Sequence, residues 1–277
     1  MLSLHPQHIA DLFVGIIDDL LPKRLPTATG GRPAVLADSE LVTLLVWNAI
    51  VLHQKTIKDL HTFTSFYLHA EFPRLPQYEG FLAHCHRVTP VMFSLLRHLL
   101  CTDEPLKFVD STMLPVCKLK RAENHRVAQR IARFGKNHQG WHFGFKLHVS
   151  VTKHGQLCGI TLTPANAYDA QVLPRIINQR TKVAVGDSHY GASVMRRIIW
   201  ERYGTIIISP PHYKQRRKLM THWQHQLLCQ RSKIEAVFDV LKEHLHLVTS
   251  FPRSEFGYLV HYVRILLGYQ IMALAAA

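Results

Sequence analysis

Three carboxylates stand at positions where a chain could hold them for chemistry. Asp110 ends a short stretch of strand character, residues 107–110, and Asp187 follows the apolar run 183–186. Glu235 lies early in residues 233–247, where apolar residues recur at helical spacing. The three can converge only if the two strands are neighbours and the helix packs over them. Such an oxygen-rich site suits Mg²⁺ or Mn²⁺, and two such ions can promote an in-line displacement at a phosphate.

Two cations flank Glu235 on the same expected helix. At about 100° per residue, Arg231, Glu235 and Lys242 fall in one line at the edge of the apolar stripe. A carboxylate between two cations fits a metal ligand beside DNA phosphates. An ordinary i,i+4 surface salt bridge, worth about 0.3–0.5 kcal/mol, explains the Arg231–Glu235 spacing equally well. The helix by itself does not decide between the two interpretations.

A fourth acid, Asp169, precedes an expected helix that runs to Asn178. An Asp at such a position is more often a helix cap than a ligand. If Asp169→Asn abolished chemistry while folding and DNA binding survived, the set of three acids would need a fourth member.

The positive charge of the chain lies in its second part. Residues 1–103 contain 8 Lys and Arg against 9 Asp and Glu, whereas residues 104–277 contain 25 against 10. This asymmetry favours a polyanionic partner, and nucleic acid in particular. The alternative is a protein that is merely basic.

The densest basic stretch is residues 118–146, and a second cluster is residues 214–218. Arg126, Arg130 and Arg133 would share one face if the first stretch were helical. We expect both stretches to contact DNA phosphates, although two solvated loops would have the same composition. The expected contacts are Lys118, Lys120, Arg121, Arg126, Arg130, Arg133, Lys136, Lys146, Arg216 and Arg217.

Other residue types narrow the class of protein. The five cysteines are far apart and form no Cys-x-x-Cys pair, which argues against a zinc ribbon or a disulfide framework and fits a reducing cytoplasm. The 20 histidines are scattered, and we interpret them as surface or phosphate-facing residues. Trp141 and Trp223 could stack on bases, although a Trp is more often a packing residue.

The periodicity changes near residue 104. Helices are expected at 8–21, 41–52, 55–66 and 90–100, and strands at 107–110, 143–152, 157–163, 183–186 and 205–209. Further helices are expected at 169–178, 192–203, 233–247 and 255–275, and residues 212–230 are expected to be a polar connection. The pattern predicts a helical N-terminal domain, residues 1–103, and an α/β domain with a mixed sheet, residues 104–277. The first domain could bind DNA by a helix-turn-helix or serve in dimerisation or packing.

No segment is expected in a membrane. Pro6 and Asp11 interrupt what would be the apolar core of a signal peptide. Residues 257–277 are long enough to span a bilayer, but Arg264 near their middle costs about 2.5–3.5 kcal/mol on insertion. A buried terminal helix is the better interpretation.

With these residues in place, the sequence resembles the DDE transposases of bacterial insertion sequences, whose catalytic domain is RNase H-like. Arg231-x3-Glu235-x6-Lys242 matches the spacing this family places around its catalytic Glu, although Leu228 stands where a Tyr is usual. Asp110 in Phe-Val-Asp-Ser resembles the first catalytic Asp, and Asp187 in Gly-Asp-Ser-His-Tyr-Gly resembles the second. Residues 144–148 and 161–169 are similar to the hairpin between these acids. The resemblance covers about residues 105–272, with a less specific similarity over residues 1–100.

The resemblance implies a Mg²⁺- or Mn²⁺-dependent enzyme with two metal ions held by Asp110, Asp187 and Glu235. It would cleave the ends of its element and transfer the freed 3′-hydroxyls into target DNA, with Arg231 and Lys242 near the cleaved phosphate. The expected partner is double-stranded DNA, bound by at least a homodimer in the cytoplasm at the nucleoid, with no small-molecule cofactor. Two alternatives remain: an RNase H-like nuclease or resolvase that cuts without joining, and a catalytically decayed DNA-binding protein.

Overall fold

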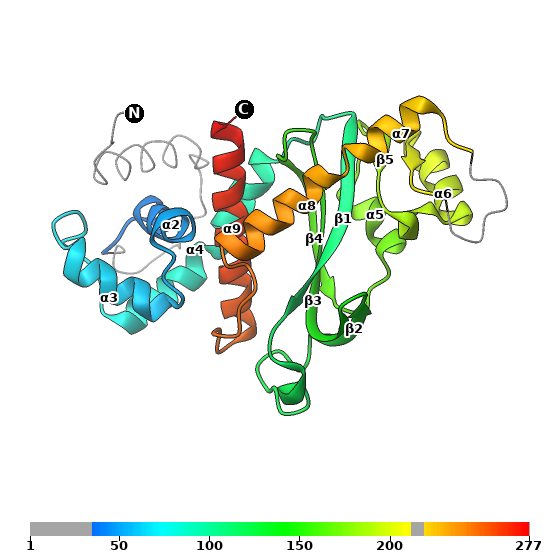
Figure 1. The fold of residues 1–277 in the computed structure, drawn as a ribbon. Helices are drawn as coiled ribbons and strands as arrows, with labels where there is room; N and C mark the ends of the chain where they lie inside the picture. The colour runs from blue at the N-terminus through cyan, green and yellow to red at the C-terminus, as the bar shows by residue number, and fades with distance from the viewer. Residues whose placement is uncertain (1–34, 212–218, 277) are drawn as a thin grey trace. The chain divides into compact units, whose positions relative to one another are not determined.

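The computed structural model describes residues 35–211 and 219–276 (Figure 1). The chain divides into two compact units. Unit 1 comprises the residues up to 99 together with 251–271, and unit 2 comprises residues 100–250 together with those after 271. We expected residues 104–277 to form one domain. The structure instead groups the C-terminal helix with the N-terminal helices.

The described residues of unit 1 form helices and the connections between them, with no strand. Helix α2, Asp38–Trp47, continues as a π-helical turn, η1, Asn48–Leu52, and is followed by α3, Ile57–Tyr67, and α4, Tyr78–Leu99. The helix expected at 90–100 is the second half of α4, which runs through Pro90. Buried residues recur at helical spacing on both sides of Pro90. Their packing maintains the helix although a proline inside a helix removes a backbone hydrogen bond. The helix expected at 8–21 lies outside the described residues.

The last helix, α9, Glu255–Ala275, completes unit 1. Gly268 approaches Ala49 and Ile50 so closely that an added Cβ would lie 3.1 Å from Ile50, and Gln270 donates a hydrogen bond to the Leu99 carbonyl (2.7 Å). α9 is the one helix among the described residues that is long and apolar enough to cross a membrane, and 72% of its most apolar window is buried inside the protein. The expectation of a buried terminal helix is confirmed, because Tyr258 and the residues from Val260 to Ile271 are buried.

Unit 2 contains one sheet of six strands. They are β1 Leu106–Pro115, β2 Arg133–Asn137, β3 Gly140–Val151, β4 Leu157–Pro164, β5 Val183–Val185 and β6 Ile206–Ile208. The strand order is β2-β3-β1-β5-β6, and β4 also pairs with β3. The pairs of β3 with β1, β2 and β4 are antiparallel, whereas β1–β5 and β5–β6 are parallel. This mixed sheet, flanked by helices, confirms the expected α/β class with a mixed sheet.

Five helical segments accompany the later strands. They are α5 Asp169–Ile176, α6 Ser193–Tyr203, α7 His222–Cys229, α8 Ser232–Asp239 and the π-helical turn η4 Val240–His244 that extends α8. Two elements were not expected. Strand β2 forms because it pairs with β3, and α7 begins at a capping box of Thr221 and Gln224 in a segment too polar to show a clear stripe.

The hypothesis that residues 126–133 form one helical face is wrong. Residues 127–131 are turns and Arg133 begins β2, with its Nη1 donating to the carbonyls of Arg130 (3.0 Å) and Ala132 (2.7 Å). The basic residues of this stretch therefore lie on a loop and a hairpin.

The two faces of the sheet are covered by different helices. Val109 packs with Leu173 of α5 and with Ala184 and Tyr190 in one buried cluster. Because side chains alternate along a strand, Ser111 shares the face of Val109 and Asp110 points to the opposite one. Helix α8 contacts β1 on its Asp110 side, as the hydrogen bond from Arg231 to Asp110 shows.

Candidate active site

Register brings the first two acids to one edge of the sheet. β1 is longer than expected, so Asp110 lies inside it, but its parallel partner β5 ends at Val185, which pairs with Phe108. Asp110 and Asp187 each follow that pair by two residues. Asp110 and Asp187 therefore lie on neighbouring segments, at the carboxyl end of the parallel pair β1–β5. Open α/β sheets form their ligand-binding crevices at this end of their strands.

Burial and neighbouring charges determine the pKa of Asp110. The pKa of Asp110 is raised to about 6, first by burial and then by the charges of Asp187 and Asp169. A hydrogen bond from the Ser111 N–H (2.7 Å) and the Arg231 guanidinium act in the opposite direction. Asp110 is thus a partly desolvated acid among like charges, a situation that a bound cation stabilises.

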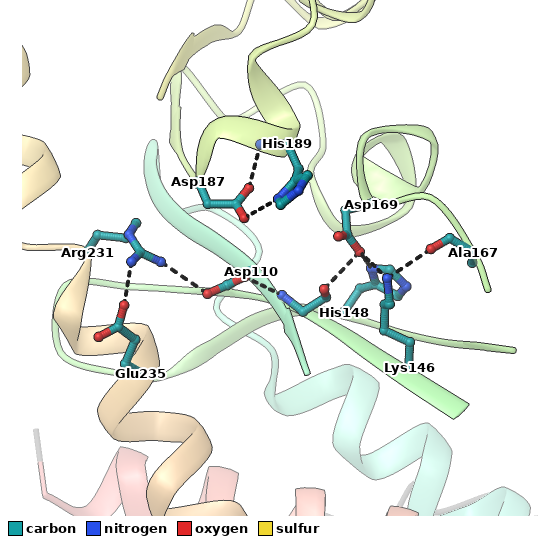
Figure 2. A network of polar contacts seen from close by, with 10 residues as sticks. Asp110, Lys146, His148, Ala167, Asp169, Asp187, His189, Arg231 and Glu235 are labelled. Carbon is teal, nitrogen blue, oxygen red and sulfur yellow. Dashed lines mark hydrogen bonds and ion pairs between the residues drawn. The ribbon is translucent and has the colours of Figure 1, made fainter. Parts of the chain in front are cut away.

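Arg231 links the first and third acids. Its Nη1 donates to Asp110 Oδ2 (3.2 Å) and its Nη2 donates to Glu235 Oε1 (Figure 2). The i,i+4 surface pair considered from the sequence is present, but it is extended to Asp110, whose side chain is only 18% exposed. The guanidinium therefore stands between two of the three expected catalytic carboxylates.

Asp187 is held by the turn that follows it. As the N-cap of η3, Ser188–Gly191, it accepts a hydrogen bond from the His189 N–H (2.9 Å), and its Oδ2 lies 2.7 Å from His189 Nδ1. That contact raises the pKa of His189. The preceding Gly186 has no room for a side chain, because an added Cβ would lie 2.7 Å from the buried Tyr190 ring. The Gly-Asp-x-x-Tyr pattern is thus a packing unit that fixes the Asp187 backbone.

Asp169 does not cap helix α5. The N-cap residue is Tyr168, which makes no side-chain cap, and Asp169 Oδ1 instead accepts from Ser111 Oγ (2.8 Å) and Lys146 Nζ (3.2 Å). It also lies 3.4 Å from Nδ1 of His148, which is fully buried. Figure 2 shows Asp169 on the far side of Asp110 from Arg231. The cap interpretation is therefore wrong, and Asp169 belongs to a polar network under the site.

Ser111 joins this network to the first acid, because its N–H binds Asp110 while its hydroxyl binds Asp169. Sequence reasoning missed Ser111 and His148. They pair across β1 and β3, and only the register of those strands reveals that they face each other.

The described side chains do not form a ready metal cluster: among them, no three His, Cys, Asp or Glu are placed to hold an ion together. The donor chemistry nevertheless fits a hard divalent cation at Asp110 and Asp187, since the charge of Asp187 raises the pKa of Asp110 and a cation would stabilise such a carboxylate. Glu235 Oε1 already accepts a hydrogen bond from Arg231, so this oxygen is free for a cation only if that bond breaks.

Lys242 lies outside the α-helical part of its segment. It belongs to η4, where the π-helical turn changes the angle between successive residues, so the single line drawn at 100° per residue ends at Asp239. Burial lowers the pKa of Lys242, and the Asp110 carboxylate is among the charges that raise it. Lys242 is therefore electrostatically coupled to Asp110.

The expected phosphate contacts fall into three groups. Arg216 and Arg217 lie outside the described residues, and Lys146 is only 11% exposed because it pairs with Asp169 and the Ala167 carbonyl. The remaining seven are exposed on the segment before β2 and on β2 itself: Lys118, Lys120, Arg121, Arg126, Arg130, Arg133 and Lys136.

Both tryptophans considered from the sequence are exposed, Trp141 by 56% and Trp223 by 50%, so the packing interpretation is wrong. Trp141 pairs across the β2–β3 hairpin with Lys136, whose ammonium lies 5.9 Å from the ring centroid. Exposed aromatic and cationic side chains together suit a nucleic-acid surface.

Comparison with known proteins identifies the family of the chain. Residues 101–255 match the family described as Transposase DDE domain, which covers more than half of the chain. This chain therefore belongs to the DDE transposases. A search of curated proteins found no match. Among solved structures, the chain is similar to one described as a pre-cleavage Mos1 transpososome, at 15% identity, with 91% of this chain and 82% of that chain covered and a TM-score of 0.22.

Proposed function

We propose that this protein is the transposase of a bacterial insertion sequence, cleaving DNA strands at the ends of the element and joining the freed 3′-hydroxyls to target DNA. The observation that carries the proposal is the placement of Asp110 and Asp187 at the carboxyl end of the parallel pair β1–β5, where the charge of Asp187 raises the pKa of Asp110. Membership of the DDE transposase family supports it.

In this proposal Asp110, Asp187 and Glu235 hold two Mg²⁺ or Mn²⁺ ions. Such ions, when bound, supply activation of a water or 3′-hydroxyl and stabilisation of the leaving oxygen. The chain contributes the orientation of the ligands. Ser111 fixes one oxygen of Asp110 through its N–H, and η3 fixes Asp187 through the His189 N–H.

Arg231 acts in this proposal as a stand-in cation. It neutralises Asp110 and Glu235 together, which offsets the cost of keeping two carboxylates near each other without a metal. A guanidinium binds a phosphate by the same paired geometry with which it binds a carboxylate. A DNA phosphate could therefore draw Arg231 away and leave Glu235 free to turn toward the other acids.

The DNA path is proposed to run over the exposed basic residues of unit 2. The seven exposed cations before and on β2 supply backbone contacts, and Trp141 beside Lys136 supplies a stacking surface. Lys146 is left out of this surface because its ammonium is satisfied by Asp169. We further propose that a homodimer binds the DNA, because two ends must be joined, and that it works at the nucleoid.

The experiment is Mg²⁺-dependent cleavage of DNA carrying the terminal repeats, compared between wild type and Asp187→Asn at equal DNA occupancy. A matched control is Asp103→Asn, which makes the same chemical change at a side chain that is 80% exposed. We expect cleavage and joining by wild type and control, and neither by Asp187→Asn. Unchanged cleavage by Asp187→Asn would remove that residue from the site.

Two alternatives have distinct outcomes in the same assay. Cleavage without joining would indicate a nuclease or resolvase. A catalytically decayed DNA-binding protein would bind DNA tightly without cleaving it in Mg²⁺ or Mn²⁺. Its DNA affinity would be the same with Asp187→Asn.

A further inference from the structure

Unit 1 contains a cavity of about 510 Å³ where α3, α4 and α9 meet. Helices α3 and α9 both start there: Thr56, the N-cap of α3, and Ser254, which precedes α9, line its wall. The volume is in the range of small-molecule sites, about 300–1,000 Å³. Nothing in the catalytic proposal for unit 2 uses this space.

The least exposed charged residue in the lining of the cavity is Arg264, which is 3% exposed. Within the described part of the chain, its Nε and Nη1 have no hydrogen-bond partner, and its Nη2 lies 3.4 Å from His261 Nδ1. Burial lowers the pKa of Arg264 to about 10, so the guanidinium is still charged at pH 7. A buried cation without a counter-ion is costly, and an anion in the cavity would offset that cost.

The rest of the lining is also positive. Lys55, Lys58 and Arg253 are exposed at its edge, and no Asp or Glu is among the described lining residues. Asp59 lies in the first turn of α3, but its carboxylate accepts the Thr56 N–H (3.2 Å). The starts of α3 and α9 add the positive ends of their helix dipoles, which favour phosphate.

One wall is apolar and aromatic. Tyr78 and Leu82 of α4 face the cavity together with Ile57, Phe251 and Pro252. A bare inorganic anion makes no use of such a wall. A planar base does, because it gains contact with apolar and aromatic side chains.

We propose that this cavity binds a nucleoside phosphate, with the phosphate on Arg264 and the base against the Tyr78 wall. A free nucleotide and a nucleotide at the end of a DNA strand present this same chemistry. Its described lining residues all belong to unit 1 and include none of the carboxylates of unit 2.

The test is calorimetric titration of the full-length protein with AMP and with inorganic phosphate. We expect saturable binding of AMP and weaker binding of phosphate. Arg264→Gln should lower AMP affinity about tenfold or more, as loss of a charge-assisted contact does. Lys153→Gln removes the same single positive charge at an exposed residue in the β3–β4 turn of unit 2, and this control variant should bind AMP like wild type.

A second variant guards against misfolding of Arg264→Gln. Lys58→Glu with Arg253→Glu reverses two exposed charges at the edge of the cavity and should also weaken AMP binding about tenfold or more. The proposal is overturned if wild type shows no saturable AMP binding, or if the variants that fold bind AMP as tightly as wild type.

Two further measurements identify the source of the nucleotide and distinguish the cavity of unit 1 from the candidate active site of unit 2. Displacement of AMP by a 5′-phosphorylated duplex assigns the cavity to DNA, and no displacement assigns it to free nucleotides; both uphold the proposal. Asp187→Asn should bind AMP unchanged. A failure of AMP binding is therefore distinct from a failure of DNA cleavage.

Discussion

The sharpest test of the network under the site is the removal of Asp169. Its side chain is 16% exposed and its main partner, Lys146, is 11% exposed, so Asp169→Ala leaves an ammonium nearly buried without a counter-charge. Loss of one partner from a buried pair costs about 3–5 kcal/mol, and this pair, not fully buried, should lie near the lower end. The loss of a helix cap would cost only about 1 kcal/mol. The two roles for Asp169 therefore predict different magnitudes.

The assay is urea unfolding of wild type, Asp169→Ala, Lys146→Met and the double variant, followed by circular dichroism. We expect a coupling energy above about 1 kcal/mol, the ceiling for exposed pairs. The control cycle is Arg197 with Glu201, an i,i+4 pair on α6 that is 80% and 58% exposed and should couple by about 0.5 kcal/mol or less. A single-variant cost of about 1 kcal/mol, with coupling no larger than in the control, would refute the network.

Three further predictions follow from other contacts. Lys242→Ala should weaken binding to the element ends and reduce the salt dependence of that binding by about one phosphate contact, measured by titration at several salt concentrations; an unchanged slope would count against a phosphate role. His148, whose pKa burial lowers to about 4, is protonated in the unfolded chain below about pH 6.5 but not in the folded one, so folding stability falls as pH drops from 7 toward 4. His148→Gln lacks this dependence, so its difference from wild type in unfolding free energy should shrink between pH 7 and pH 5; a constant difference would contradict the buried neutral imidazole. Gly135→Ala should destabilise unit 2 by about 1–3 kcal/mol in urea unfolding, because its Cβ would lie 2.2 Å from the Ala165 carbonyl oxygen. An unchanged free energy of unfolding would mean that β2 can move away from Ala165, the residue after β4.

The sequence was sufficient to predict those helices and strands whose residue pattern is clear within the segment itself. Strands β3 and β4 alternate or carry β-branched residues beside a Gly-containing turn, and α6, α8 and α9 carry apolar residues at helical spacing, so their presence and most of their bounds follow from sequence. Strand β2 was not predicted because it forms through pairing with β3. Helix α7 was not predicted because it has no strong apolar stripe. The association of α9 with unit 1 is likewise a result of long-range packing.

The sequence alone was sufficient to predict a DDE transposase, from three acids whose order and spacing resemble that family and from a basic second part suited to DNA, and the family is confirmed. Tertiary structure decided how those acids are held. The register of β5 against β1 brings Asp187 near Asp110, Arg231 lies between Asp110 and Glu235, and Asp169 joins the network of Ser111 instead of capping a helix. The physical reason is that residue type fixes what a side chain can bind, whereas its actual partner depends on strand register and burial, which arise between segments far apart in the chain.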